Sequence, residues 1–237
     1  MKTKNNSLSE VLVISIRFRS ERRNSSIRVS GKNIKCHIYN AAFVCDGEQR
    51  YDIKLHDKRV YELPFNLIFD GMDKCKILIE NPHDLTILVL NDSALDVKIE
   101  NLHLCSALRY FSVKSTNCTM YLEDFALCQS LRRIELDNTS SNGDVSILSK
   151  LSGLMWVTLD NTECAGDISV LSRLTKLWRF SASNSKVYGD INTIHCPDIG
   201  TLRIDGTKCI GDPKKFISDN NNLEEFKGLD YNFRRSV

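Results

Sequence analysis

The sequence lacks the features that several common protein classes require. Its longest mainly apolar stretch, Val11 to Ile16, is far too short for a membrane-spanning helix, and Arg17 and Arg19 follow it without a small-residue cleavage site. There is no G-x-S-x-G, no H-E-x-x-H and no phosphate-binding glycine loop, and the five histidines have no recognisable nucleophile partner. We therefore expect no membrane span, secretory signal, enzymatic activity, catalytic residue or cofactor, and the localisation stays open.

What the chain does contain is a phrase repeated at a fixed step. Gly-Asp followed by an apolar residue or proline begins at Gly143, Gly166, Gly189 and Gly211, at steps of 23, 23 and 22 residues. Self-similarity at such a period marks a chain that stacks one small unit many times. The sequence therefore predicts a solenoid.

A leucine pattern follows the same period. Each unit starts with Leu or Ile, has apolar residues three and five positions later, and ends with Thr or Ser. The closing residues are Thr116, Thr139, Thr162, Ser185 and Thr207. The resulting L-x-x-L-x-L-x-x-T resembles leucine-rich repeats, with Thr or Ser where Asn or Cys is usual. It is most similar to the 23-residue variant of bacterial surface and secreted proteins, whose wording Gly166 to Thr175 (GDISVLSRLT) follows closely.

The resemblance covers residues from about Leu85 to Gly211 and implies a fold. The alternating apolar residues of the L-x-L core predict a short parallel strand in each unit. The apolar residues spaced by three after each Gly-Asp predict a 3₁₀ helix or single helical turn on the convex side, with Gly permitting the turn and Asp capping the helix. The expected fold class is an α/β, mostly β, leucine-rich-repeat solenoid with a parallel concave sheet.

The nine cysteines include no C-x-x-C pair. Cys118, Cys164 and Cys209 stand two residues after the closing Thr, and Cys105 and Cys128 also differ by 23 positions. An unpaired cysteine packs as a small hydrophobe, so we expect interior positions and neither disulfides nor a metal site. Reduced thiols suit a cytoplasm or another reducing setting.

Residues 1–62 lack the leucine pattern and alternate with a period of two. Five strands are expected, around Val11 to Phe18, Ile27 to Val29, Ile34 to Ile38, Phe43 to Val44 and Tyr51 to Leu55. Their short spacing predicts hairpins in a small antiparallel β domain that caps the first repeat, with the solenoid and its terminal cap over residues 63–237. The register between residues 63 and 84 is ambiguous, since Ile77 and Ile79 also read as a strand.

Charge is spread unevenly along the chain. The net charge is +2, but residues 1–59 contain 13 Lys or Arg against 6 Asp or Glu, a balance of +7 that leaves −5 for the rest. A basic block can attract nucleic acid or an acidic partner. Because Arg17 and Arg19 alternate with Ile16 and Phe18, as on a half-buried strand, we interpret the block as a solvated strand face and do not expect nucleic-acid binding.

One repeat position collects large aromatic and basic side chains. Parallel strands stack about 4.8 Å apart, so residues at one repeat position form a ladder across the sheet. The position two after the first leucine holds Tyr110, Arg133, Trp156 and Arg179 in four consecutive units. Outward-facing aromatic and arginine side chains stack by cation–π contact, and the same residue types dominate binding hot spots. The alternative is a ladder whose members only stabilise each other.

Two neighbouring repeat positions add the acidic residues Glu135, Asp137 and Asp160. Asp137 and Asp160 lie one unit apart and repel each other unless Arg133 or Arg179 screens them. Paired carboxylates also occur in glycoside hydrolases. Here they recur through repetition, so a hydrolase is the weakest of the functional hypotheses.

Two stronger hypotheses remain. The first is a non-enzymatic module that binds a protein or glycan through the concave face. Its candidate contact residues are Tyr110, Arg133, Trp156, Arg179, Glu135, Asp137 and Asp160. The second is a structural subunit of a virion or cell-surface assembly, docked through the N-terminal β domain. Neither the partner nor the oligomeric state follows from the sequence.

Overall fold

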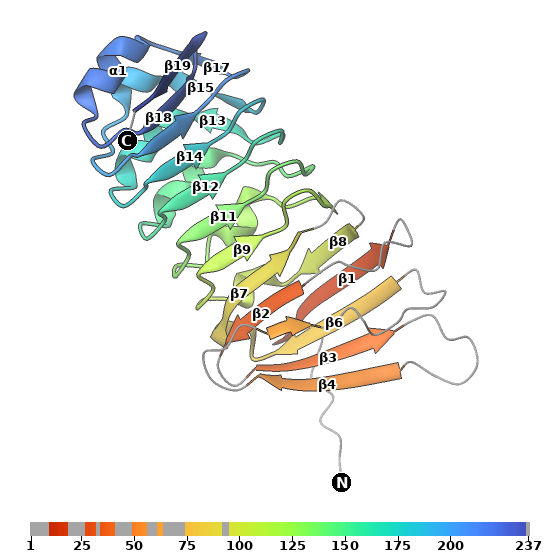
Figure 1. The fold of residues 1–237 in the computed structure, drawn as a ribbon. Coiled ribbons are helices and arrows are strands. Elements are labelled where there is room, and N and C mark those ends of the chain that lie inside the picture. The colour runs from red at the N-terminus through yellow and green to blue at the C-terminus, as the bar shows by residue number, and fades with distance from the viewer. Residues whose placement is uncertain are drawn as a thin grey trace.

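The chain forms one elongated stack of turns, with the N-terminal strands at one end and the only labelled α-helix at the other (Figure 1). This computed structural model describes residues 10–18, 27–31, 34–40, 49–55, 61–63, 74–91 and 95–235. The strand expected around Phe43 and Val44 lies outside the described residues.

A ten-stranded sheet, here called the long sheet, runs along the stack. Seven of its strands are parallel neighbours, namely β7 (Leu85–Leu90), β9 (Tyr110–Ser112), β11 (Arg133–Glu135), β12 (Trp156–Thr158), β14 (Arg179–Ser181), β16 (Thr201–Arg203) and β18 (Glu225–Gly228). From β9 onward, each begins two residues after the first Leu or Ile of its unit. The period of 23 therefore predicted these strands and their order.

The N-terminal strands extend the stack beyond β7. In the long sheet, β2 (Ile27–Gly31) pairs antiparallel with β7 and with β5 (Tyr61–Leu63). A second, six-stranded sheet contains β1 (Leu12–Phe18), β3 (Ile34–Asn40), β4 (Gln49–Leu55), β6 (Lys74–Glu80), β8 (Leu95–Glu100) and β10 (Asn117–Cys118). The expected strands are thus present wherever the chain is described there, and the strand reading of Ile77 and Ile79 is confirmed by β6.

Their pairing differs from the expected run of hairpins. Among the described N-terminal strands, only β3 and β4 pair as sequence neighbours, while β1 lies between β6 and β8. These contacts cross residue 62, and one hydrophobic core extends from Leu12 to Phe226. The physical reason is that alternation identifies a strand but carries no information about its partner. The division into two domains at residue 62 stays a prediction.

Outside the long sheet, the repeated units carry short helices and a third sheet. The 3₁₀ helices are η2 (Pro82–Asp84), η3 (Leu102–Leu104), η4 (Leu122–Phe125), η5 (Val145–Lys150), η6 (Ile168–Arg173) and η7 (Ile191–Thr193). They confirm the expected convex turns. A three-stranded parallel sheet of β13 (Ala165–Asp167), β15 (Lys186–Asp190) and β17 (Lys208–Ile210) was not expected, because two or three residues per unit give no periodicity to detect.

The repeated Gly-Asp has the local cause that the sequence suggested. Gly166 has a φ of +120°, and a Cβ there would lie 2.5 Å from an Asp144 carboxylate oxygen, so glycine is required for both reasons. The next residue, Asp167, caps η6 by accepting a hydrogen bond from the Ser169 backbone N–H at 2.8 Å. The same arrangement recurs at Asp144 and Asp190.

The closing Thr or Ser of each unit stabilises the turn that follows the strand. Each hydroxyl donates to the backbone carbonyl three residues earlier, at 2.6 to 2.7 Å, in Thr116, Thr139, Thr162, Ser185 and Thr207. Asn138, Asn161 and Asn184 precede three of them in the left-handed conformation, and their side-chain amides form a hydrogen-bonded ladder. Thr and Ser therefore act here by satisfying a carbonyl of their own turn.

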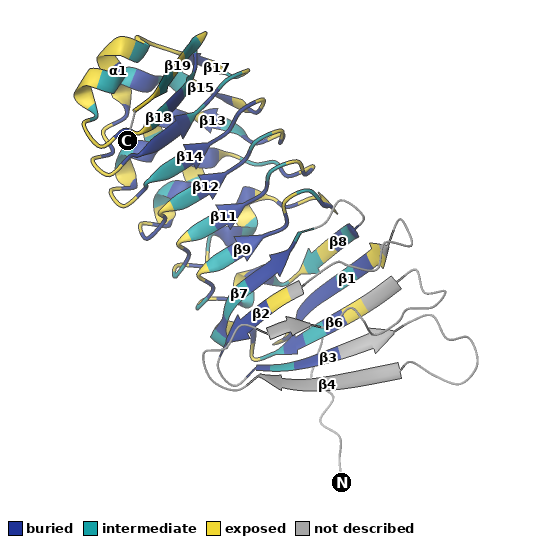
Figure 2. Ribbon diagram, in the orientation of Figure 1, coloured by how far each residue is buried: buried dark blue, intermediate teal, exposed yellow. Residues whose placement is uncertain are grey.

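The core consists mainly of the repeated leucines and isoleucines, and the long-sheet strands from β7 to β18 each contain buried residues (Figure 2). The expected interior positions of Cys105, Cys118, Cys128, Cys164 and Cys209 are confirmed, since all five are buried. The seven cysteines whose side chains the structure describes are all unpaired. Burial raises the pKa of Cys118 to about 12 and that of Cys164 to about 11, so these thiols stay protonated and unreactive at neutral pH.

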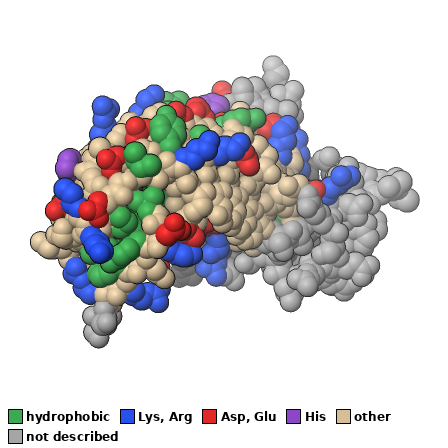
Figure 3. Space-filling view, turned by 90° about the horizontal axis from the view of Figure 1, so that it is seen from above, with side chains coloured by type: hydrophobic (Ala, Val, Ile, Leu, Met, Phe, Trp, Pro, Cys, Tyr) green, Lys and Arg blue, Asp and Glu red, His purple; other side chains and the backbone are tan. Residues whose placement is uncertain are grey.

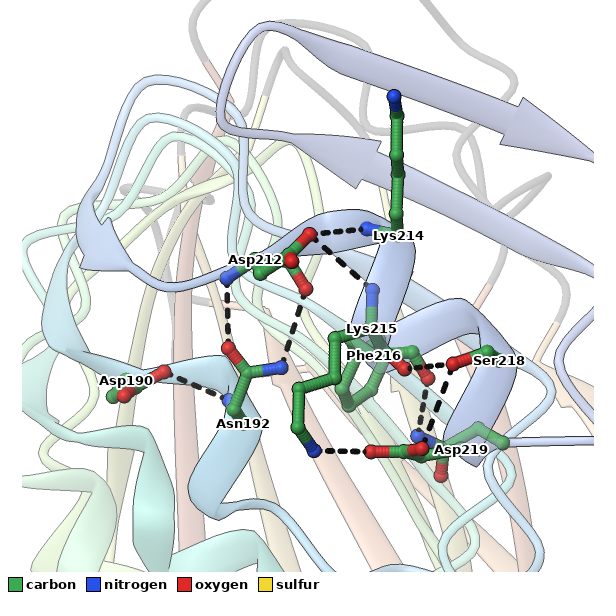
Figure 4. A network of polar contacts seen from close by, with 9 residues as sticks. Asp190, Asn192, Asp212, Lys214, Lys215, Phe216, Ser218 and Asp219 are labelled. Carbon is green, nitrogen blue, oxygen red and sulfur yellow. Dashed lines mark hydrogen bonds and ion pairs between the residues drawn. The ribbon is translucent and has the colours of Figure 1, made fainter.

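A short α-helix and a hairpin close the C-terminal end. Helix α1 (Pro213–Asp219) starts where the fourth Gly-Asp occurs, and Asp212 accepts from the backbone N–H groups of Lys214 and Lys215 (Figure 4). Asn192 of η7 joins the network through the Asp212 backbone, accepting at 2.7 Å and donating at 3.2 Å. Strand β19 (Tyr231–Arg234) pairs antiparallel with β18 and covers its edge.

Candidate binding face

The four residues of the predicted ladder are direct neighbours across the long sheet. Tyr110 is paired with Arg133, Arg133 with Trp156, and Trp156 with Arg179 in the registers of β9, β11, β12 and β14. All four are half-buried and lie on the same side of the strands. We call Tyr110, Arg133, Trp156 and Arg179 the aromatic-arginine ladder.

The ladder is held by cation–π stacking. The central guanidinium carbon of Arg133 lies 4.9 Å from the Tyr110 ring centroid and 4.4 Å from that of Trp156. The guanidinium carbon of Arg179 lies 4.8 Å from the Trp156 ring. Trp156 is therefore sandwiched between two arginines, a contact that contributes about 0.5–1 kcal/mol per pair at exposed sites and more when water is excluded.

Glu135 supports the first half of the ladder. Its carboxylate is almost fully buried and accepts a hydrogen bond from the Tyr110 hydroxyl at 2.8 Å and another from Arg133 Nε at 3.0 Å, with a second ion-pair contact from Arg133 Nη2. Burial by itself raises the pKa of Glu135, but these hydrogen bonds and the arginine charge outweigh it and hold the pKa below its usual value. Glu135 is thus an ionised internal anchor and is not open to a partner.

The second half of the ladder lacks such an anchor. Among the described residues, Arg179 has no ion pair and no hydrogen-bond acceptor, and its contact is the Trp156 ring. The Nε of Arg179 and the indole Nε1 of Trp156 are both buried without a hydrogen-bond partner in the described chain. The ladder therefore satisfies itself at Tyr110 and Arg133 but leaves donors unsatisfied at Trp156 and Arg179.

Asp137 and Asp160, beside the ladder, each accept hydrogen bonds from the next unit of the solenoid. Asp137 accepts from the Thr158 hydroxyl at 2.5 Å and from the Asp160 backbone N–H at 2.9 Å. Asp160 in turn accepts from Ser181 and from the Ser183 backbone N–H, each at 2.7 Å.

Of the two possibilities that the sequence left open, screening by an arginine is not found among the described residues, because Arg133 pairs with Glu135, and hydroxyl and N–H groups bind the two carboxylates. Burial, joined by the nearby charges of Asp160 and Glu135, raises the pKa of Asp137 despite its hydrogen bonds. The repeating hydrogen bonds give both residues a structural role.

A second row of side chains, which was not predicted from the sequence, lies at the edge of this face. Arg109, Arg132, Met155 and Trp178 each precede a ladder residue by one position, and their backbones are linked from unit to unit by N–H···O bonds of 2.9 Å. We call these four residues the cationic margin. Arg109, Arg132 and Met155 are exposed, and the Trp178 ring centroid lies 5.5 Å from that of Trp156. The signal was available, since the four residues are themselves 23 positions apart.

Two glycines leave room for two large side chains of the cationic margin, Trp178 and Arg132. A Cβ at Gly200 would lie 2.2 Å from the Trp178 indole Nε1, so the indole lies directly on the Gly200 backbone. A Cβ at Gly153 would lie 1.6 Å from a terminal nitrogen of Arg132, which places that guanidinium against the chain of the next unit. Small residues at these positions thus let the margin lie flat beside the ladder.

Three features identify the fold: the period of 23 residues, the parallel strand in each unit and the 3₁₀ turn in each unit. It is a leucine-rich-repeat solenoid. No family model matches this chain, and no curated protein matches it in sequence. In the part of the chain that the structure describes, every helix is too short or too polar to serve as a membrane span, and no cluster of three His, Cys, Asp or Glu side chains is arranged to hold a metal.

Solved structures with a similar fold include plant and bacterial proteins. The leucine-rich-repeat ectodomain of the receptor kinase SOBIR1 from Arabidopsis thaliana shares 21% identity over 54% of this chain and 72% of its own, with a TM-score of 0.48. Internalin C2 from Listeria monocytogenes shares 20% identity over 65% and 74%, with a TM-score of 0.47. The plant peptide hormone receptor RGFR1, solved with RGF2, shares 22% identity over 53% of this chain but only 21% of its own length, with a TM-score of 0.49. Similarity at this level does not indicate what this chain binds.

Proposed function

We propose that this chain is a non-enzymatic binding module that recognises a protein partner through the face of the long sheet that carries the aromatic-arginine ladder. The observation that supports this most is the unequal pairing of the two arginines of the ladder. Arg133 is held by Glu135, whereas Arg179 is stacked on the Trp156 ring and has no ion pair among the described residues. Preorganised Trp and Arg side chains of this kind are typical of interface hot spots.

In this proposal the candidate residues divide into two roles. Tyr110, Arg133, Trp156 and Arg179 make the contact, because they are half-buried and reach the surface of the sheet. Glu135, Asp137 and Asp160 hold the surface in shape, because their oxygens are occupied by neighbouring hydroxyl, guanidinium and N–H groups. A bacterial origin, which the similarity of the repeat motif to bacterial 23-residue repeats suggested, stays a prediction.

The test is affinity capture from native lysate with quantitative mass spectrometry, comparing wild type with the double variant Trp156→Ala, Arg133→Ala. Loss of a hot-spot residue weakens binding by about 2 kcal/mol or more, roughly 30-fold, so specific partners are expected to be strongly depleted. Tyr121→Ala, Leu127→Ala is the matched control, because both residues are exposed and flank η4 on the other side of the unit.

Equal recovery of partners by wild type and the Trp156, Arg133 variant would count against this face. Circular dichroism of both variants verifies that each is folded. A glycan array with the same proteins addresses the second partner class, and ladder-dependent binding to glycans alone would replace the protein partner in the proposal.

A further inference from the structure

The face of the long sheet is electrically polarised across its strands. Arginines gather where the strands begin, at Arg109, Arg132, Arg133 and Arg179. Carboxylates gather just after the strands end, at Asp137, Asp160 and Asp205. The two rows therefore present opposite charge to a molecule that lies along the stack.

The carboxylates of the acidic row are hydrogen-bonded by neighbouring residues of the same chain. Asp137 and Asp160 accept hydrogen bonds from hydroxyl and backbone N–H groups, and Asp205 accepts from Lys227 Nζ at 2.8 Å and from Ser183. Burial alone raises the pKa of Asp205, but the bonds from Lys227 and Ser183 and the lysine charge outweigh it and lower the pKa. The acidic row therefore has few free acceptor positions to offer a ligand, but only Asp205 has a cation beside it, so the row keeps its negative charge.

Most arginines of the basic row lack an ion-pair partner among the described residues. Arg133 pairs with Glu135, and Arg203, farther along the sheet, lies 4.0 Å from a Glu225 oxygen. Within the described ranges, Arg109, Arg132 and Arg179 have no ion pair. Three guanidinium groups without internal carboxylates thus border one edge of the proposed contact face.

Apolar surface lies between these arginines. Met155 is 49% exposed, and the Trp178 and Trp156 rings form a tilted pair beside it. Seen from above, the described surface carries basic and apolar side chains next to one another (Figure 3). From Arg109 to Arg179 is three units, roughly 14 Å, a length that about five residues of extended chain span.

We propose that the partner contributes a short acidic segment, with carboxylates flanking at least one apolar side chain, and that this segment lies along the cationic margin. The inference rests on the proposed function and specifies its partner. Arginine binds carboxylates in a bidentate geometry, and pairing across an interface selects partners of complementary charge. A nucleic acid fits less well, because its repeated phosphates would also meet the carboxylates of the opposite row.

The experiment selects from a random dodecapeptide display library on the immobilised full-length chain. Enriched peptides are then measured by fluorescence anisotropy as synthetic probes, together with analogues in which Gln and Asn replace Glu and Asp. We expect enrichment of acidic residues, an affinity loss of about tenfold or more for the amide analogues, and weakening with added salt. Arg109→Gln, Arg132→Gln, Arg179→Gln is expected to reduce affinity to a similar degree.

The matched control is Lys150→Gln, Arg173→Gln, Lys208→Gln. It removes an equal number of positive charges from exposed positions of η5, η6 and β17, which are not part of the long sheet, and is expected to bind acidic peptides within about twofold of wild type. An equal loss in this control would show a general charge effect and overturn the inference.

The remaining outcomes separate this inference from the proposed function. Neutral or basic peptides that lose binding in Trp156→Ala, Arg133→Ala would overturn the acidic segment and leave the contact face in place. Peptides that bind that variant as well as wild type would overturn both. A selection that enriches no peptide would also overturn the proposal of an acidic segment. If single-stranded oligonucleotides or heparin oligosaccharides bind the wild type and lose binding in the triple arginine variant, the ligand of the cationic margin is another polyanion and the proposal of an acidic peptide is wrong.

Discussion

At the scale of single residues, the carboxylates of the sheet face differ more than their repeated positions suggest. Asp137 and Asp205 occupy the same repeat position, yet the pKa of Asp137 is raised and that of Asp205 is lowered. Burial raises both, but only Asp205 has a lysine within hydrogen-bond distance, at 2.8 Å. The repeat thus determines where a side chain lies, and its neighbours determine how it ionises.

The opposite pKa directions give a pH-dependent prediction for Asp137. A folded-state pKa above the unfolded value means that wild type loses stability as pH rises from the ordinary Asp pKa, about 3.9, through the raised value. Asp137→Asn has no charge to bury, so we expect its stability relative to wild type to increase over this pH range and then to level off. Urea unfolding between pH 3 and pH 8 measures this difference.

Asp205→Asn is the control, and the opposite trend is expected. The lowered pKa of Asp205 contributes stability that is present above the ordinary Asp pKa and is lost as pH falls through the folded value. The variant is therefore expected to be less stable than wild type at neutral pH and to approach it in acid. Parallel pH profiles for the two variants would contradict the assignment.

At the scale of the element, the Gly-Asp turn determines where each 3₁₀ helix begins. Gly166→Ala forces a side chain into a φ of +120° and against the Asp144 carboxylate. We expect a loss of about 1–3 kcal/mol in the free energy of unfolding, as for other strained backbone positions. Chemical denaturation of the purified variant measures the loss.

Gly153→Ala is the comparison for that measurement. Its added Cβ meets the far end of the flexible Arg132 side chain, which can move away. We therefore expect a smaller stability loss than for Gly166→Ala. A Gly166→Ala protein as stable as wild type would show that the turn does not require the left-handed conformation.

At the scale of the whole molecule, the N-terminal strands and the solenoid share two sheets and one core. Strand β2 covers the edge of β7, and β1 fills the space between β6 and β8. Removing residues 1–62 would expose both edges together with the apolar core residues next to them. We expect the truncated protein to aggregate or to unfold without cooperativity.

Size-exclusion chromatography and thermal unfolding of the truncated chain test this prediction, with removal of residues 1–9 alone as the control because it leaves β1 intact. A soluble, cooperatively folded chain from residue 63 onward would instead support two separate domains. That the N-terminal strands dock the protein in a larger assembly stays a prediction. If the truncated chain does not fold, this prediction has to be tested with substitutions of surface residues on these strands.

The parts of this protein that follow from stacking could be predicted from the amino-acid sequence. Residues 23 positions apart become neighbours, so the ladder of Tyr110, Arg133, Trp156 and Arg179, the buried cysteines and the Asp caps could all be predicted. Side-chain direction was not predictable in the same way. Whether Arg133 reaches Asp137 or Glu135 depends on rotamers and burial, which periodicity does not encode.

Which segments far apart in the chain pair with one another became known only from the folded chain. The antiparallel pairing of β1 with β6 and β8 depends on which buried faces fit, because every alternating strand is a possible partner for every other. That Arg109, Arg132 and Arg179 form no ion pair with the described residues is likewise a property of the assembled surface. A sequence records which charges exist, and the fold determines which of them are neutralised.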